Sequence, residues 1–231
     1  MYNHRWMTID HRVQLTILRE LLFHPQARFV DLNQTDLTND HFTFHLKRLL
    51  DQGVIEKNND LYQLTSLGLE IAGRLDIKTL QFSRQPKVGV AVCVTRKLLN
   101  QPEVLIGRRL KDPSFGKAGV FFAEKVRTGE SLISAAARCL ENEVGVKADY
   151  TYIGTKHIMR YRNDQLTQDV VFTCFLAKIT SGEVKPTTSE SENFWANVTE
   201  INKVPDTFED TLEDLELIKK GKPFFVEKTF K

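Results

Sequence analysis

The sequence predicts an α+β protein of two domains, the first mainly helical and the second built from strands around a central helix. The 231 residues exceed the length of about 100–150 residues that is commonest for one domain. Helical periodicity dominates the first third of the chain, and apolar runs typical of strands dominate the remainder. We place the first domain at residues 1–75, a linker at 76–86 and the second domain, which ends in a helix, at 87–231.

The composition excludes long-range disorder and gives no sign of a membrane protein. Hydrophobic residues make up 41% of the chain, and the net charge of +2 is too balanced to indicate nucleic acid or membrane by itself. The longest apolar run, near Val88–Val94, is far shorter than the ~20 residues that cross a bilayer, and the N-terminal sequence is too polar for a secretory signal. We expect a cytoplasmic protein with no membrane partner. Its three cysteines form no CxxC pair and are expected to be reduced thiols: Cys93, Cys139 and Cys174.

Two amphipathic helices and a hairpin are predicted in the first domain. Residues 10–23 and 38–53 each repeat apolar side chains at spacings of three and four, and the second of these stretches stops at Gly53. Residues 54–65 form two short β-prone runs around the turn sequence Asn-Asn-Asp, which predicts a hairpin. A further helix is expected over residues 66–75.

The order helix, short helix, helix, hairpin is the order that a winged helix-turn-helix requires. The strings FHLKRLLDQGVIEK and LYQLTSLGLEIA resemble the recognition helix, wing and following helix of winged-helix regulators similar to the arsenic-repressor and multidrug-repressor families. The resemblance implies binding to double-stranded DNA. It places these residues toward DNA: Asn39, His41, Thr43, Lys47 and Arg48 on and before the helix, and Lys57, Asn58 and Asn59 in the wing.

The charge of this domain sets a condition on DNA binding. Residues 1–80 carry nine Lys and Arg against ten Asp and Glu, and DNA affinity grows mainly from phosphates neutralised by cations. A module of this charge must gather its cations on one face or dimerise, so we expect a homodimer. A purely structural or protein-interaction role is the alternative.

The second domain is predicted as a sandwich of helix on sheet. Strands are expected over residues 87–96, 103–109, 151–162 and 169–179, with one central helix through residues 132–143. A C-terminal amphipathic helix, stopped at Gly221, is expected to bury Phe208, Leu212, Leu215 and Ile218.

Residues 116–146 contain the most informative motif. They resemble the Nudix box, G-x5-E-x7-R-E-U-x-E-E-x-G-U with U aliphatic, and the spacing is matched without a gap at Glu130, Arg138, Leu140, Glu143, Gly145 and Val146. The resemblance extends over about residues 86–220 and implies a Nudix-type α/β/α sandwich. Nudix enzymes cleave a diphosphate linked to another moiety by using a divalent metal.

Two of the three metal-binding carboxylates that the resemblance implies are absent. The matching positions hold Cys139, Asn142 and Glu143, which spacings of three and four place on one helix face. Magnesium prefers carboxylate oxygens, while a thiol is a soft ligand and an amide carries no charge. We therefore expect no required cofactor and no metal site, with Glu143 as the residual ligand or catalytic group if one exists.

The loop before this helix also departs from the family. The usual Pro-Gly-Gly corresponds to residues 122–124, and the acid expected shortly afterwards corresponds to Arg127. We expect cations to replace metal as partners of a bound phosphate, and the predicted ligand-binding residues are Arg108, Arg127, Arg138, Phe122 and Glu124. Arg138 has an equally weighted alternative, because its family counterpart mainly orients neighbouring carboxylates. Aromatic residues in strands are also more often part of the core.

These features predict a DNA-binding transcriptional regulator that senses a nucleotide-like or sugar-phosphate small molecule through a catalytically impaired Nudix domain. It resembles Nudix-related regulators of transcription. The alternative is a Nudix hydrolase that needs Mg²⁺ or Mn²⁺, in which Glu124 replaces a missing metal-binding acid and Glu190 or Glu192 acts as the base. A scaffold that binds neither ligand nor DNA is a third interpretation.

Overall fold

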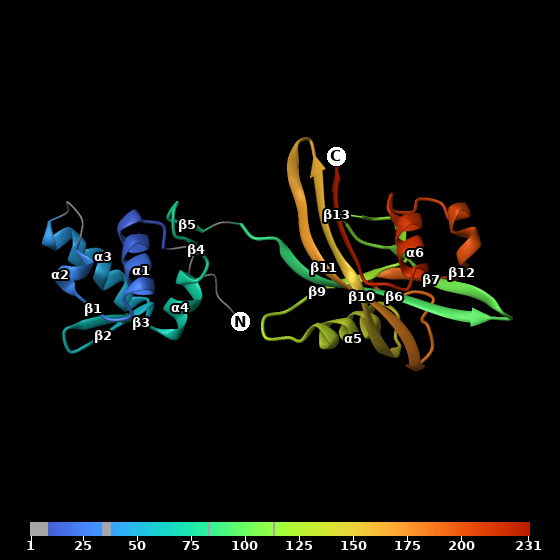
Figure 1. The fold of residues 1–231 in the computed structure, drawn as a ribbon, viewed down its shortest axis with the longest axis horizontal. Coiled ribbons are helices and arrows are strands. Elements are labelled where there is room, and N and C mark those ends of the chain that lie inside the picture. The colour runs from blue at the N-terminus through green and yellow to red at the C-terminus, as the bar shows by residue number, and fades with distance from the viewer. Residues whose placement is uncertain (1–8, 34–37, 83, 113) are drawn as a thin grey trace. The chain divides into compact units, whose positions relative to one another are not determined.

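A computed structural model describes residues 9–33, 38–82, 84–112 and 114–231. The chain divides into two compact units, Met1–Gln85 and Pro86–Lys231 (Figure 1). Among the helices of the described residues, none combines the length and the apolar character needed to cross a membrane.

The first unit has the order of elements expected from its sequence. A three-stranded antiparallel sheet has the strand order β1-β3-β2, and β1 is an addition to the expected hairpin. Only two residues of β1 pair with β3, so its sequence is too short to show alternation. The elements are α1 (Arg12–Phe23), β1 (Ala27–Arg28), α2 (Phe29–Leu32), α3 (Asn39–Asp51), β2 (Ile55–Asn58), β3 (Leu61–Leu64) and α4 (Ser66–Ala72).

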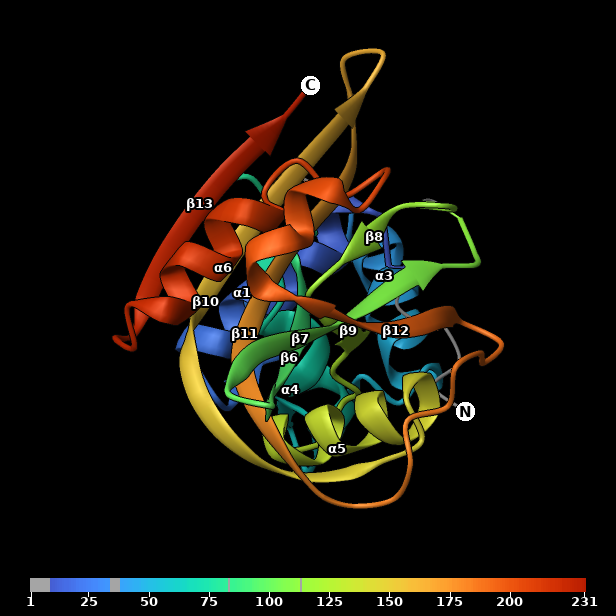
Figure 2. The same ribbon diagram turned by 90° about the vertical axis from the view of Figure 1, so that its right-hand side faces the viewer.

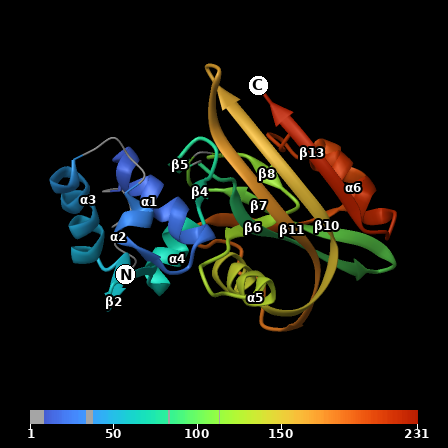
Figure 3. The ribbon, with the colours of Figure 1, turned by 60° about the vertical axis from the view of Figure 1, so that its left-hand side comes forward.

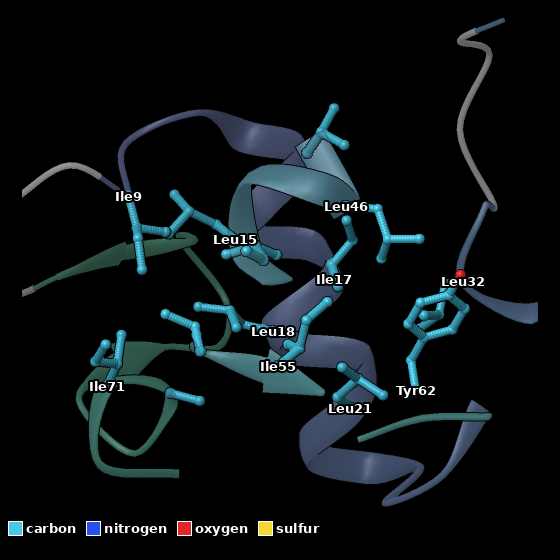
Figure 4. Packing of buried hydrophobic residues seen from close by; sticks show 14 of the residues in the cluster. Ile9, Leu15, Ile17, Leu18, Leu21, Leu32, Leu46, Ile55, Tyr62 and Ile71 are labelled. Carbon is cyan, nitrogen blue, oxygen red and sulfur yellow. The ribbon is translucent and has the colours of Figure 1, made fainter. Parts of the chain in front are cut away.

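The apolar faces of α1 and α3 form the core of this unit. Leu18 of α1 and Phe42 and Leu49 of α3 are completely buried, and Figure 4 shows the α1 side chains meeting Leu46, Ile55 and Ile71. Gly53 follows α3 at a positive φ of 68°, a conformation that glycine adopts without steric cost. Because Phe42, Leu46 and Leu49 recur at helical spacing and are buried, the opposite face of α3 is exposed to solvent.

The segment expected to be a linker is partly folded. Strands β4 (Leu75–Asp76) and β5 (Gln81–Phe82) pair with each other, and Leu80 and Phe82 pack against the core of the first unit. The first part of residues 76–86, expected to be the linker, therefore packs on the first unit. The apolar residues of this part are Ile77, Leu80 and Phe82, and they are too few to give a periodic signal in the sequence.

The second unit is built on one large mixed sheet with the strand order β12-β7-β6-β11-β10-β13, to which β8 and β9 add short pairings. Strand β13 pairs in parallel with β10, beside which it lies in Figure 3, and the sequence analysis did not predict it. The elements are β6 (Lys87–Leu98), β7 (Gln101–Arg109), β8 (Ala118–Gly119), β9 (Phe122–Lys125), α5 (Leu132–Glu143), β10 (Lys147–Arg162), β11 (Gln165–Ser181), β12 (Ser191–Asn197), the 3₁₀ helix η2 (Val198–Lys203), α6 (Thr211–Lys219) and β13 (Phe224–Phe230).

Helices α5 and α6 lie on opposite faces of this sheet (Figure 2). Side chains alternate along each strand, so Leu105 joins the core under α5 while Ile106 joins the core under η2 and α6. The C-terminal helix is present as expected, but its predicted buried face is wrong in part. Leu212 is exposed, and the buried residues of α6 are Thr211, Asp214 and Leu215.

Leu18 tests the core of the first unit. We expect Leu18→Ala to lower the free energy of unfolding of this unit by about 2–5 kcal/mol, because it removes a fully buried side chain. The matched control is Leu69→Ala on α4, where the leucine is 57% exposed, and we expect a change within about 0.5 kcal/mol. Urea denaturation followed by circular dichroism measures both, and equal losses would contradict the packing.

Candidate functional site

A cavity of about 120 Å³ is lined by residues of β7, β10 and β11 and by residues at the start of α6. Its walls combine flat apolar surfaces with converging polar groups, which is the usual character of a small-molecule site. The aromatic, charged and polar residues that line it are Phe121, Phe172, Phe208, Arg109, Lys156, Arg160, Asp210, Asp214, Ser114, Gln168 and Thr211.

The altered box places two of its three key side chains inside the protein. Ser131 caps α5 by accepting a hydrogen bond from the backbone N–H of Ser134. On the last turns of the helix, Cys139 and Glu143 are buried, and the Cys139 Sγ lies 3.9 Å from Oε1 of Glu143. Asn142 is exposed instead, so the expected grouping of all three on one face is only partly realised.

Arg109 connects the altered box with the cavity. Its Nη1 lies 3.7 Å from Oε1 of Glu143, which is 2% exposed, and Arg109 also lines the cavity. Burial raises the pKa of Glu143 to about 7, and this increase is opposed mainly by the positive charge of Arg109. A guanidinium is thus the cation that faces the remaining acid of the box.

This donor set does not suit Mg²⁺. Burial, with the nearby charge of Glu143, raises the pKa of the Cys139 thiol well above its ordinary value, so the sulfur is a neutral, soft ligand. Asn142 points to the surface and Glu143 faces Arg109. In the part of the chain that the structure describes, no three His, Cys, Asp or Glu side chains are grouped to hold an ion. Magnesium requires several oxygen ligands in nearly octahedral geometry.

Arg138 holds the loop that precedes α5. Its Nε and Nη2 donate to the two carboxylate oxygens of Glu130 at 2.8 Å, Nη2 also donates to the carbonyl of Lys125, and Nη1 lies 3.4 Å from Glu124. Hydrogen bonds from Arg138 and from the Arg127 backbone lower the pKa of Glu130 to about 2. Arg138 therefore contacts Glu124 and holds the loop through Glu130 and Lys125. These contacts correspond to the alternative role of Arg138, in which it orients neighbouring carboxylates.

The other predicted ligand residues lie elsewhere. Phe122 is 1% exposed and belongs to the core under α5, which corrects its assignment to the ligand. Arg108 donates to the carbonyls of Gly116 and Pro205, and Arg127 is exposed at the surface. Because successive side chains of β7 point to opposite faces, Arg109 and not Arg108 shares the face of Leu105 under α5. Strand alternation in the sequence contained this signal.

In the first unit, α3 leaves its polar face open. The predicted DNA-facing residues of this helix, Asn39, His41, Thr43, Lys47 and Arg48, are all exposed, opposite the buried Phe42 and Leu49. Asn39 accepts a hydrogen bond from Asn33. In the hairpin, Asn58 is exposed, and the Nζ of Lys57 lies 4.0 Å from Oδ1 of Asp60. Phe44 is 58% exposed on the same helix, and the sequence analysis did not single it out.

A sequence model of the NUDIX domain matches residues 84–215. The chain belongs to the NUDIX family. The match confirms the Nudix domain that the motif in residues 116–146 predicts. A search of curated protein sequences returned no match.

Solved NUDIX structures show the same fold. The NUDIX domain of NrtR from Shewanella oneidensis, crystallised with ADP ribose, is 18% identical, with a TM-score of 0.52 over 68% of this chain and 99% of that chain. The mutator MutT protein of Bacillus halodurans is 16% identical, with a TM-score of 0.50 over 62% of this chain and 90% of that chain. At these identities the likeness supports the fold alone.

The buried acid of this NUDIX unit predicts a pH effect on stability. Burial raises the pKa of Glu143 to about 7 in the folded protein, so the folded state keeps a proton that the unfolded chain releases from about pH 4.5 upward. Its stabilising contribution is complete below that pH and is lost as the pH rises through 7. We expect E143Q to gain up to about 3 kcal/mol over the wild type between pH 5 and pH 8.

Chemical denaturation at both pH values measures this difference. Glu141→Gln is the matched control, because Glu141 is exposed on the same helix, and its difference from the wild type should not change with pH. An E143Q difference that is the same at pH 5 and pH 8 would show that Glu143 is charged throughout.

Proposed function

We propose that the protein is a DNA-binding transcriptional regulator whose NUDIX unit senses a nucleotide-like or sugar-phosphate compound without a metal cofactor. The observation that carries the proposal is the position of Arg109, which faces the residual acid Glu143 and also lines the cavity. An arginine there offers a bidentate partner for a phosphate, in a family whose enzymes use a metal for that charge.

The cations around the cavity differ in how far neighbouring acids neutralise them. Lys156 is neutralised by Asp210 and Asp214, and Arg160 contacts Glu209. The positive charge of Arg109 is neutralised less completely. Its neighbour Glu143 has a raised pKa, so that carboxyl is partly protonated near neutral pH. Arg109 is therefore the cation best placed for a phosphate. The presence of ADP ribose in the NrtR NUDIX structure is consistent with such a ligand.

The first unit supplies the proposed DNA-reading surface as a winged helix-turn-helix. Helix α3 carries exposed polar and basic side chains, and the β2–β3 hairpin follows it as a wing would. Lys47 and Arg48 are the two cations of α3 that would neutralise phosphates. In a homodimer, ligand binding would change the relative populations of two placements of the DNA-reading units and so alter DNA affinity.

One observation favours a hydrolase as the second candidate. Glu143 retains the carboxyl of the box, and its pKa of about 7 is in the range that suits a general base near neutral pH. This function would require Mg²⁺ or Mn²⁺ on a donor set that lacks the other two carboxylates of the family motif.

DNA binding is tested with the full chain and a duplex of random sequence. We expect binding that weakens between about 50 and 200 mM salt, and we expect K47A/R48A to reduce the slope of log affinity against log salt by about 2, because each phosphate contact contributes about 0.9. Fluorescence anisotropy measures the affinity. K78A is the control, since Lys78 is exposed outside α3 and the hairpin. Equal slopes for K47A/R48A and K78A would contradict the proposed surface.

Ligand binding is tested by thermal unfolding with ADP-ribose in the presence of EDTA. At a concentration about 100 times the Kd, we expect Tm to rise by about 5 °C or more. Arg109→Met should remove most of this rise because it removes the phosphate partner. R162M, which changes an arginine near the exposed β10–β11 turn, should retain it. A rise that occurs only with added Mg²⁺ would contradict a metal-free site.

A further inference from the structure

We propose that Lys156, Asp210 and Asp214 form a subsite for a sugar ring with adjacent hydroxyl groups. The inference rests on the proposed function and extends it, because it assigns the part of the ligand that enters the cavity while its phosphate reaches Arg109. None of these three residues belongs to the Nudix box.

The three side chains form a buried cluster in the cavity wall. The Lys156 Nζ donates to Oδ2 of Asp210 at 2.8 Å and to Oδ1 of Asp214 at 2.5 Å. Their exposed fractions are 6%, 9% and 7%, yet all three line the cavity. Burial alone would lower the pKa of Lys156, but the two carboxylates raise it above its ordinary value, so the ammonium is charged. The cluster therefore has two acids for one base.

The cluster retains hydrogen-bonding capacity for a ligand. Each aspartate accepts from Lys156 with one side-chain oxygen, and the ammonium donates two of its three N–H groups to them. Oδ1 of Asp210 and Oδ2 of Asp214 therefore remain as acceptors, one on the N-cap of α6 and the other four residues further along the helix. Thr211 and Gln168 add polar groups on the same cavity. Two neighbouring acceptors beside one donor require a ligand that mainly donates.

Hydroxyl groups match this arrangement better than a nucleobase or a cation. A hydroxyl donates to an aspartate and accepts from Lys156 with the same atom, while a base N–H only donates and a base carbonyl only accepts. A cation would be placed against the ammonium that already occupies the centre of the cluster. The rings of Phe121, Phe172 and Phe208 supply apolar walls for the C–H face of a sugar, and Phe121 also faces the Lys156 ammonium at 5.5 Å.

A role limited to holding α6 on the sheet makes a different prediction. Buried ion pairs often stabilise a fold by little, because desolvation offsets the attraction. If the cluster only fastened α6, a change at Asp210 would alter the binding of all ligands alike or of none. A sugar subsite predicts a selective loss.

The test compares ADP-ribose with inorganic pyrophosphate, which has no sugar ring, by isothermal titration of the full chain in EDTA. We expect ADP-ribose to bind at least tenfold more tightly than pyrophosphate. D210N should weaken ADP-ribose binding about tenfold and leave pyrophosphate binding unchanged, since it removes an acceptor and leaves Lys156 paired with Asp214. D214N is a second variant with the same expected selectivity. D169N is the matched control, because Asp169 contacts His157 and does not line the cavity.

The outcomes separate this inference from the proposed function. Equal affinities for pyrophosphate and ADP-ribose, or equal losses for both in D210N, would overturn the sugar subsite while an anionic ligand site remained. Free ribose or glucose is titrated in parallel. Binding of either that D210N abolishes would support the subsite even if pyrophosphate failed to bind, which would count against the phosphate part of the proposed function. No detectable binding of any of the four compounds would overturn the subsite.

Discussion

The second unit depends on a contact between a guanidinium and a buried carboxyl. Arg109 at the end of β7 faces Glu143 at the end of α5, where the family's motif would gather carboxylates around a metal. An arginine carries one fixed charge and five directed donors, so it can hold a phosphate but cannot lower the pKa of a water as a metal does. Arg109 also lines the cavity. In the proposed function, this position would bind a phosphate without the metal that cleavage requires.

The fold supplies this contact through alternation in its sheet. Odd-numbered positions of β7 face α5, and the intervening ones face η2 and α6, so Arg109 and Arg108 have different surroundings. Arg138 on α5 is hydrogen-bonded to Glu130 in the loop before that helix. Lys156 of β10 holds the start of α6 and lines the cavity, as Arg109 does. The proposed ligand site and the packing of α6 therefore involve the same charged residue.

The sequence was sufficient for local structure and for the family. Periodicity predicted α1, α3 and α5, and the box spacing identified Cys139 and Asn142 as the altered positions and Glu143 as the retained acid. Alternation along β7 separates Arg109 from Arg108 in the sequence, but only the folded sheet shows that the face of Arg109 is the one toward Glu143. Lys156 and Asp214 are 58 residues apart, and no local pattern joins them. Phe122 was misassigned because an aromatic residue in a loop motif and one in a core have the same sequence appearance.

The most direct measurement of the central claim is product formation. Purified full chain is incubated with ADP-ribose and Mg²⁺ or Mn²⁺, and AMP is quantified by chromatography over many hours. We expect no AMP above the protein-free control, because one carboxyl opposed by an arginine does not hold a catalytic metal. Steady formation of AMP that E143Q abolishes would contradict this claim and identify the protein as a hydrolase.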